Sequence, residues 1–278
     1  MPSPTSYSSP FWPSRLAALS LLNWLAWQGM ALAQQPATAG VASPAKTDPA
    51  APSADPVAAA KRIKQTGPGL YELGEVKFNS STREVRVPTV VNMRDGAIEF
   101  ALVHESGKTH ESLLKMTASA VDIQVALLLC NYQAAEQGLV SGYEKDAQVI
   151  KALEQTTPKT PGANRVRIEL EWGEASGKLQ HMPLQQWMLE ANTKKPPTDV
   201  NHWIFNGSSI MSAGFAAELQ GNTIAIYVDR TAVLSWPGKS NRDDDHWLPN
   251  TALIPKEDTP ITLIISPEKT PNSNTPKP

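Results

Sequence analysis

The chain has 278 residues, a formal net charge of −2 and a single cysteine. A charge so close to zero excludes the strongly basic surface typical of nucleic-acid binding, and no long basic run indicates an anionic membrane surface. One cysteine excludes an intramolecular disulfide, and also an iron–sulfur cluster or a cysteine-rich zinc site held by this chain alone.

The first 33 residues have the pattern of a secretory signal peptide. Arg15 supplies the positive charge, residues 16–27 form an apolar run too short to span a bilayer comfortably, and Ala31 and Ala33 frame a cleavage site. We therefore expect cleavage near Ala33 and an extracytoplasmic protein, periplasmic or secreted, without a transmembrane helix in the mature chain. The alternative is that the segment is kept as an N-terminal anchor.

Composition divides the remainder of the chain. Residues 34–65 are rich in proline and alanine and contain few large apolar side chains, which predicts a disordered linker. The end of the chain, 267–278, has the same composition and is predicted to be a disordered tail. Between them, residues 66–266 are numerous enough for one domain with a real core.

Short strands dominate the first half of this domain. The expected strands cover residues 70–78, 83–91, 98–104 and 108–114. A Ser-Gly turn at 106–107 lies between the last two, and its spacing predicts a β-hairpin.

The main helix is predicted at about 119–136. Ser119 and Asp122 have the form of a capping box, and Gly138 is a suitable residue to end the helix. Its middle is apolar almost all round, which predicts burial on most sides. Cys130 lies in that middle and is interpreted as a small buried hydrophobe rather than a reactive thiol.

The second half continues as strands with one short helix. Residues 165–172 alternate apolar and charged side chains, which is typical of a half-buried antiparallel strand, and 178–182 is its expected partner. A short second helix is predicted at about 184–191, after Pro183. Further strands are expected at 200–205, 223–228, 233–236 and 261–265. The sequence thus predicts a single α+β domain dominated by antiparallel β-sheet, with one main buried helix.

Several short segments, taken in order, resemble a known family. They read KTHESLL at 108–114, VALLL at 125–129, GKL at 177–179, PLQQW at 183–187, HWIFNGS at 202–208 and DTPITLI at 258–264. This order resembles the YdjY-domain proteins, found among exported proteins of planctomycete-type bacteria, over about residues 69–266. The resemblance implies an exported bacterial domain and supplies no reaction. Some relatives carry a ferredoxin-like label, but one cysteine cannot hold a cluster.

Three adjacent polar residues, His110, Glu111 and Ser112, are the first candidates for chemistry. On a strand, His110 and Ser112 share one face and Glu111 lies on the other, so a serine triad cannot be built from this run alone. No G-x-S-x-G elbow surrounds Ser112. The alternative interpretation is a strand end whose polar groups satisfy a turn or the start of the helix.

His202 and Trp203 extend the candidate set. If His110 and His202 meet across the sheet with a carboxylate such as Glu111, they would suit zinc or iron, although no H-x-x-H or H-x-H spacing supports such a site. The acidic run 243–246 is expected to be a solvated loop, because it lacks the order of a calcium loop. Trp236 and Trp247 flank that loop, which weakly indicates an interaction surface.

We expect an exported, non-catalytic binding or interaction domain of the YdjY type, with an unknown protein or cell-envelope partner and no evident cofactor. The alternative is a metal-dependent enzyme, such as a hydrolase, that uses His110 and His202. A third hypothesis is a cell-envelope structural protein that self-associates.

Overall fold

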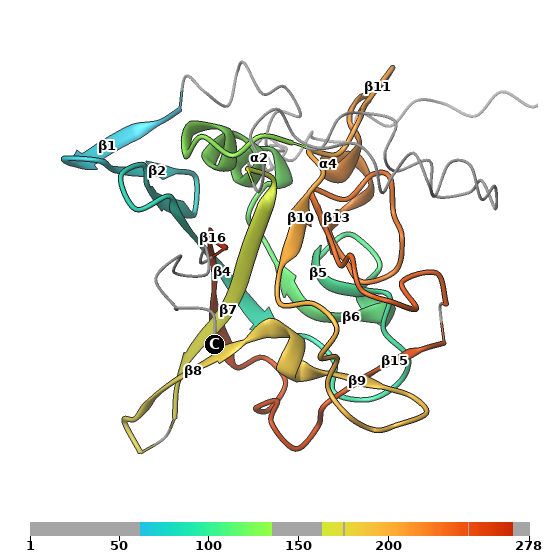
Figure 1. Ribbon diagram of the computed structural model, residues 1–278. Coiled ribbons are helices and arrows are strands. Elements are labelled where there is room, and N and C mark those ends of the chain that lie inside the picture. Colours follow the sequence, from blue (N-terminus) through green and yellow to red (C-terminus); the bar gives the residue numbers. More distant parts are fainter. Residues whose placement is uncertain (1–61, 135–162, 175, 244, 269–278) are drawn as a thin grey trace, which may run out of the picture. The chain divides into compact units, whose positions relative to one another are not determined.

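The computed structural model describes residues 62–134, 163–174, 176–243 and 245–268, which lie in the unit Ala50–Pro278 (Figure 1). The predicted signal peptide and the predicted helix end at Gly138 lie outside these residues, as does most of the predicted linker and tail. Strand β1 begins at Lys64 and strand β16 ends at Pro267, so regular structure extends past both predicted domain boundaries, 66 and 266.

Short strands account for most of the regular structure that is described. They are β1 (Lys64–Gly67), β2 (Leu70–Leu73), β3 (Val76–Asn79), β4 (Glu84–Val91), β5 (Phe100–His104), β6 (Ser112–Met116), β7 (Arg165–Gly173), β8 (Leu179–Pro183), β9 (Met188–Glu190), β10 (Trp203–Phe205), β11 (Ile210–Met211), β12 (Gly214–Phe215), β13 (Asn222–Ala225), β14 (Leu234–Ser235), β15 (Trp247–Pro249) and β16 (Pro260–Pro267). The helices are α2 (Ala120–Leu129) and α4 (Ala216–Gln220), with 3₁₀ turns η1 (Thr109–Glu111) and η2 (Leu184–Trp187). The prediction of an α+β domain dominated by β-strands is confirmed.

The large sheet closes on itself. Its strands follow the order β4-β16-β7-β10-β14-β13-β5-β6, and β6 also pairs with β4, which makes an eight-stranded barrel. Two of the pairings between described strands, β5–β6 and β13–β14, are parallel. The sheet is therefore a closed, mixed sheet instead of the simple antiparallel sheet that the strand pattern predicted.

Alternating burial explains the long strands of this barrel. β7 has its apolar side chains buried and the charged ones between them at least partly exposed, as its sequence predicted. The inward-facing side chains are Val166, Ile168, Leu170 and Trp172. β16, which contains the strand predicted at 261–265, lies between β4 and β7 and is antiparallel to both.

The predicted hairpin between 98–104 and 108–114 is wrong. Residues Thr109–Glu111 form the 3₁₀ turn η1, and β6 runs parallel to β5 with Phe100 opposite Ser112. The chain turns at Gly107, whose N–H donates to the carbonyl of His104, but then passes back along β5 before it enters β6. Gly107 also lies close to the end of α4, where an added Cβ would be 3.1 Å from the carbonyl oxygen of Gly221. We call residues 105–111 the β5–β6 crossover.

Helix α2 is buried as predicted, but it ends at Leu129 instead of about 136. Asn131 adopts a left-handed conformation directly after the helix, with φ of 59°. The predicted capping box is absent, since tertiary partners take both of its side chains. The Ser119 hydroxyl donates to Glu218 Oε2 at 2.9 Å, and Asp122 forms an ion pair with Arg62.

The short helix predicted at 184–191 is also wrong. The segment makes the 3₁₀ turn η2 and continues as β9, which pairs with β15. Both Trp187 and Met188 are fully buried, and a strand that leaves the turn places these consecutive side chains in the core. Strand pairing therefore prevails over the helical pattern of a stretch that is too short to form a stable helix alone.

Tryptophans fill much of the interior. Trp203 packs against Trp236 with ring centroids 5.0 Å apart, and Trp236 packs edge-on against Trp247 at 6.3 Å. All three are buried, so the prediction that Trp236 and Trp247 mark an exposed interaction surface is wrong. Cys130 is buried as predicted, and burial raises the pKa of its thiol to about 11.

Candidate functional site

The run His110, Glu111 and Ser112 lies at the end of the β5–β6 crossover, not along a strand. Because η1 turns the backbone, the three side chains reach different environments. The His110 side chain is 74% exposed, Glu111 is partly buried, and Ser112 is fully buried at the start of β6. The predicted shared face of His110 and Ser112 is therefore not formed.

Ser112 and Cys130 are closed to substrates. The Ser112 hydroxyl donates to the carbonyl oxygen of Leu114 at 2.8 Å within the core. Burial raises the pKa of the Cys130 thiol, which leaves it protonated at neutral pH. Neither the Ser112 hydroxyl nor the Cys130 thiol is therefore placed to act as a nucleophile.

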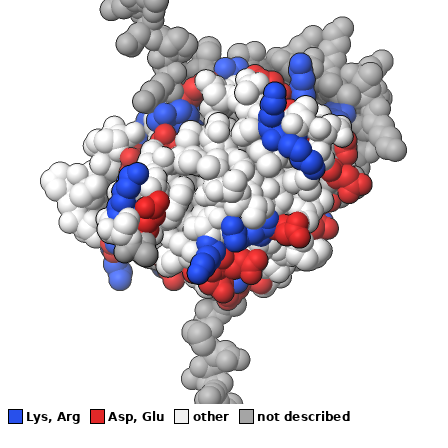
Figure 2. Space-filling view, turned by 90° about the horizontal axis from the view of Figure 1, so that it is seen from below, with Lys and Arg blue, Asp and Glu red and all other residues white. Residues whose placement is uncertain are grey.

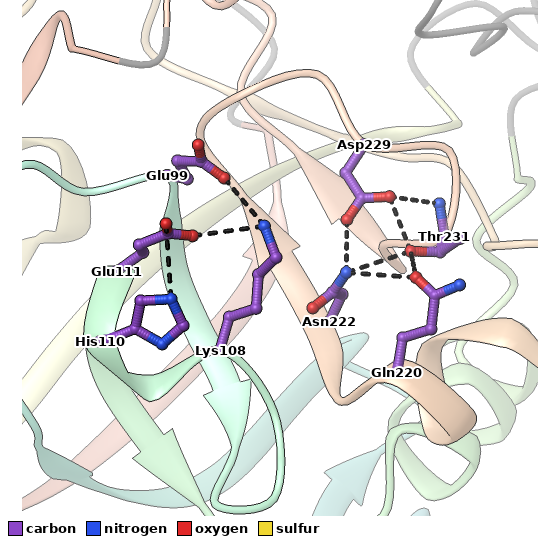
Figure 3. Close-up of polar contacts among 8 residues, drawn as sticks. All are labelled: Glu99, Lys108, His110, Glu111, Gln220, Asn222, Asp229 and Thr231. Atoms are coloured by element: carbon purple, nitrogen blue, oxygen red, sulfur yellow. Dashed lines mark hydrogen bonds and ion pairs between the residues drawn. The ribbon is translucent and has the colours of Figure 1, made fainter. Parts of the chain in front are cut away.

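Lys108 joins two carboxylates in what we call the crossover charge cluster: Glu99, Lys108 and Glu111 (Figure 3). Lys108 Nζ lies 3.3 Å from Glu99 Oε2 and 3.3 Å from Glu111 Oε2. The same ammonium lies 5.4 Å from the centre of the Phe100 ring in β5. His110 Nε2 approaches the other oxygen of Glu111 at 3.5 Å and faces solvent. The cluster thus fastens the crossover to the beginning of β5.

Burial and charge act together on the ionisation of this cluster. Burial raises the pKa of Glu99, Lys108 lowers it, and the neighbouring Glu111 raises it again, with a net increase. For Lys108, burial lowers the pKa, but the two carboxylates outweigh burial and raise it. Lys108 therefore stays charged and is committed to partners within the chain.

His202 lies in a separate environment from His110. Its Nδ1 is 3.4 Å from Glu268 Oε1, and its pKa is lowered by burial, against the effect of Glu268. Within the described ranges, no three His, Cys, Asp or Glu side chains come close enough to hold a metal ion, so the expected set of His110, His202 and a carboxylate does not assemble. Trp203, the remaining candidate, is a core residue of β10.

In the acidic run 243–246, Asp243 and Asp245 are exposed as predicted, whereas the His246 side chain is only 12% exposed and packs against Trp247. The Asp243 carboxylate lies 3.7 Å from His246 Nδ1. Asp244 lies outside the described residues.

A second polar network, which the sequence did not single out, lies at the β13–β14 crossover, residues 226–233 (Figure 3). Asn222 Nδ2 donates to Asp229 Oδ2 at 2.7 Å and to Thr231 Oγ1 at 3.3 Å. The Thr231 hydroxyl lies 2.6 Å from Asp229 Oδ1 and 2.9 Å from Gln220 Oε1. Asn222 is almost fully buried, so the network joins β13, α4 and the crossover from inside.

This network supports a small hairpin, β11–β12. The Ser208 hydroxyl donates to the carbonyl oxygen of Thr231 and accepts the N–H of Ala217 at 3.1 Å. Gln220 Nε2 lies 3.9 Å from Met211 Sδ, which links the network to the hairpin itself. The base of the hairpin is therefore tied to two other elements.

The outer part of the hairpin carries apolar side chains that nothing described covers. Ile210 is 65% exposed and Met211 45%, and Leu219 of the adjoining α4 is exposed as well. We call these three residues the apolar hairpin surface. α2, α4 and β12 are in contact in series at one end of the domain (Figure 1). Leu128 and Leu129 are also exposed, but they lie in the last turn of α2, whereas Glu218 of α4 bonds to its first turn.

Charge is absent from the two segments that form this end. Residues 203–217, which include the hairpin, and 123–134, which include most of α2, contain no Asp, Glu, Lys or Arg. The view from the opposite side shows an uncharged area with acidic and basic side chains around it (Figure 2). In the β15–β16 connection, on that opposite side, Leu253 is the large apolar side chain with appreciable exposure, at 38%. The hairpin segment therefore combines exposed apolar side chains with a sequence that contains no charged residue.

Among the described residues, no helix is long and apolar enough to cross a membrane. Comparison with family models, with curated proteins and with solved structures finds no match to this chain.

Proposed function

We propose that this protein is an exported binding domain of the YdjY type that holds a cell-envelope partner through the apolar hairpin surface. The observation that carries the proposal is the exposure of both Ile210 and Met211 on a hairpin whose base is fixed by hydrogen bonds. Soluble domains rarely expose contiguous large apolar side chains without an interaction that uses them.

Binding is favoured over catalysis by the state of the polar residues. Ser112 and Cys130 are buried, and Lys108 is already paired with two carboxylates. A catalytic group needs access to substrate and a free proton-transfer partner. The placement of His110 and His202 gives no support to a metal-dependent hydrolase built on those two residues.

Burial of the apolar hairpin surface by a partner would contribute a modest free energy of association. Complete burial of an exposed Leu, Ile or Met side chain contributes about 1.5–3 kcal/mol, so each half-exposed side chain offers roughly 1 kcal/mol. The three side chains of the apolar hairpin surface together therefore offer roughly 3 kcal/mol. Because the hairpin base is already ordered, little of this energy is lost in ordering the backbone.

The test places a photo-crosslinking amino acid at position 210 of the full chain in a bacterium that exports it. The matched control carries the same amino acid at position 179, since Leu179 is 62% exposed on the β7–β8 hairpin. We expect a discrete crosslinked product from position 210 and none from position 179. Equal labelling at both positions, or no product at 210, would contradict the proposal.

A further inference from the structure

We propose that the partner of the apolar hairpin surface is a lipid bilayer surface, which Ile210 and Met211 enter without electrostatic attraction. The inference rests on the proposed function, because it names the occupant of the same surface. Four features of the hairpin carry it: exposure on both faces, absence of charge, a rigid base and a small apolar area.

Both faces of β11 are open. Consecutive side chains of a strand point to opposite faces, so Ile210 and Met211 project in opposite directions. Both are nevertheless exposed, as are Ser212 and Ala213 at the tip. A strand that docks on a protein typically places alternate side chains in pockets and leaves the others outside. An apolar medium that surrounds the hairpin covers both faces at once.

The second feature is the missing charge. A charged side chain costs several kcal/mol in hydrocarbon, so a segment that enters lipid must avoid one. No charged residue occurs in 203–217. The β7–β8 hairpin provides the contrast, since its exposed Leu179 follows Lys178, and Gln180 Nε2 bonds to Glu174. In the β7–β8 hairpin, the neighbouring charges therefore oppose insertion of Leu179 into lipid. In the β11–β12 hairpin, no charge opposes insertion of Ile210 and Met211.

The backbone of the hairpin is prepared for an apolar environment. β11 and β12 pair with each other, with Ile210 opposite Phe215 and Met211 opposite Gly214. The Ala216 N–H donates to the carbonyl oxygen of Ser209 at 2.9 Å. Backbone groups that bond to each other carry a smaller cost on leaving water than free ones. The Ser208 hydroxyl bonds to Thr231 and Ala217 and keeps the base of the hairpin in place.

The apolar area is too small for a second copy of the chain. A stable protein interface buries about 800 Å² and roughly 20–30 residues on each side. Ile210, Met211 and Leu219 are the exposed large apolar side chains that β11 and α4 offer among the described residues. A fluid bilayer needs no matching surface, so a few inserted side chains suffice for reversible attachment.

The hairpin segment itself carries no basic residue that would select anionic lipids. Surface attraction to anionic lipids requires Lys or Arg near the membrane and weakens with salt. Because residues 203–217 supply neither, attachment should depend on apolar insertion alone. We expect equal binding to neutral and to anionic vesicles, and little change between about 0.1 M and about 1 M salt.

The test uses the full chain with an environment-sensitive fluorophore on Ser212→Cys, at the exposed tip of the hairpin. Cys130 is fully buried, so the label goes to the new cysteine. Neutral phosphatidylcholine vesicles should shift the emission to the blue. The same label in an Ile210→Ser/Met211→Ser background should require at least about tenfold more lipid for the same shift. A label on Leu179→Cys should not respond.

Four results would overturn the inference: no shift at position 212; a shift only with anionic vesicles that disappears at high salt; the same shift in the double-serine background; or an equal shift at position 179. Crosslinking of a protein at position 210, together with no response to vesicles, would retain the proposed function and exclude the lipid partner. No crosslink at 210 and no response to vesicles would exclude both. Concentration-dependent dimerisation that the double-serine variant abolishes would replace lipid with a second copy.

Discussion

The crossover charge cluster and the apolar hairpin surface differ in how their side chains are satisfied. The first lies in the β5–β6 crossover, and the second is bonded at its base to the β13–β14 crossover. In the first, Lys108 lies 3.3 Å from each of Glu99 and Glu111 and pairs with both carboxylates. In the second, polar groups are satisfied at the base while Ile210 and Met211 remain uncovered at the tip. The charged residues around Lys108 therefore fasten the β5–β6 crossover, whereas an uncharged segment supplies the exposed apolar surface.

Among the polar contacts, the largest expected effect on stability is that of the network beneath the hairpin. Asn222→Ala removes the donor to Asp229 and Thr231 and leaves both acceptors without it. We expect a loss of about 2 kcal/mol in the free energy of unfolding, measured by urea denaturation. Gln180→Ala, which removes an exposed bond to Glu174, should change it by less than about 0.5 kcal/mol. Equal effects of the two substitutions would mean that the network does not fix the hairpin base.

The charge cluster should respond less strongly. Lys108→Met keeps the length of the side chain over Phe100 but leaves Glu99 and Glu111 close together without a cation. We expect a loss of about 1 kcal/mol, because Lys108 is about half exposed and solvent screens part of the interaction.

Lys115→Met is the matched control for that substitution. Lys115 pairs at 3.1 Å with Asp258, whose side chain is largely exposed, so its removal should cost less than about 0.5 kcal/mol. A Lys108→Met protein as stable as the wild type would show that the cluster does not hold the crossover. The first region of the comparison would then lose its structural role.

Properties that depend on local pattern were predicted well from the sequence. β7 followed from alternation, and the burial of Cys130 followed from its apolar surroundings. The choice of strand partner is not local, so β6 was predicted as the antiparallel partner of β5 although it lies parallel to it. The same limit applies to the capping box at Ser119, because Glu218, the residue that replaced it, is far away in the chain.

Among the candidate residues too, residue type could be predicted from the sequence, whereas position in the fold could not. His110 and Glu111 were found by their chemistry, but η1 gave them a structural position that no strand pattern indicates. The hairpin was missed, because its small and apolar residues have no polar signature. The signal that could have found it is the run 203–217, which contains no charge and places Gly207 and Gly214 on either side of Ile210 and Met211.

The pH dependence of stability should report on the Glu99 carboxyl of the charge cluster. Burial and Glu111 raise the pKa of Glu99 above its ordinary value of 4.5, so the folded protein holds this proton more tightly than the unfolded chain. The stability that this carboxyl contributes is therefore full below pH 4.5 and is lost as the pH rises through the raised pKa. Glu99→Gln should remove that loss, which urea midpoints at a series of pH values would measure. A variant with the wild-type slope would show that Glu99 is not the group that titrates.

The smallest effect on stability is expected where the effect on binding is largest. Ile210 and Met211 are exposed, so the double substitution Ile210→Ser/Met211→Ser removes little buried apolar surface on folding. We expect a change of less than about 0.5 kcal/mol in the free energy of unfolding, with an unchanged denaturant slope. Phe215→Ala, in the same hairpin but buried, should instead cost about 3–5 kcal/mol. If the double variant were destabilised as much as Phe215→Ala, the tip would be part of the core in solution. The hairpin would then have no free apolar surface, and the contrast with the charge cluster would be lost.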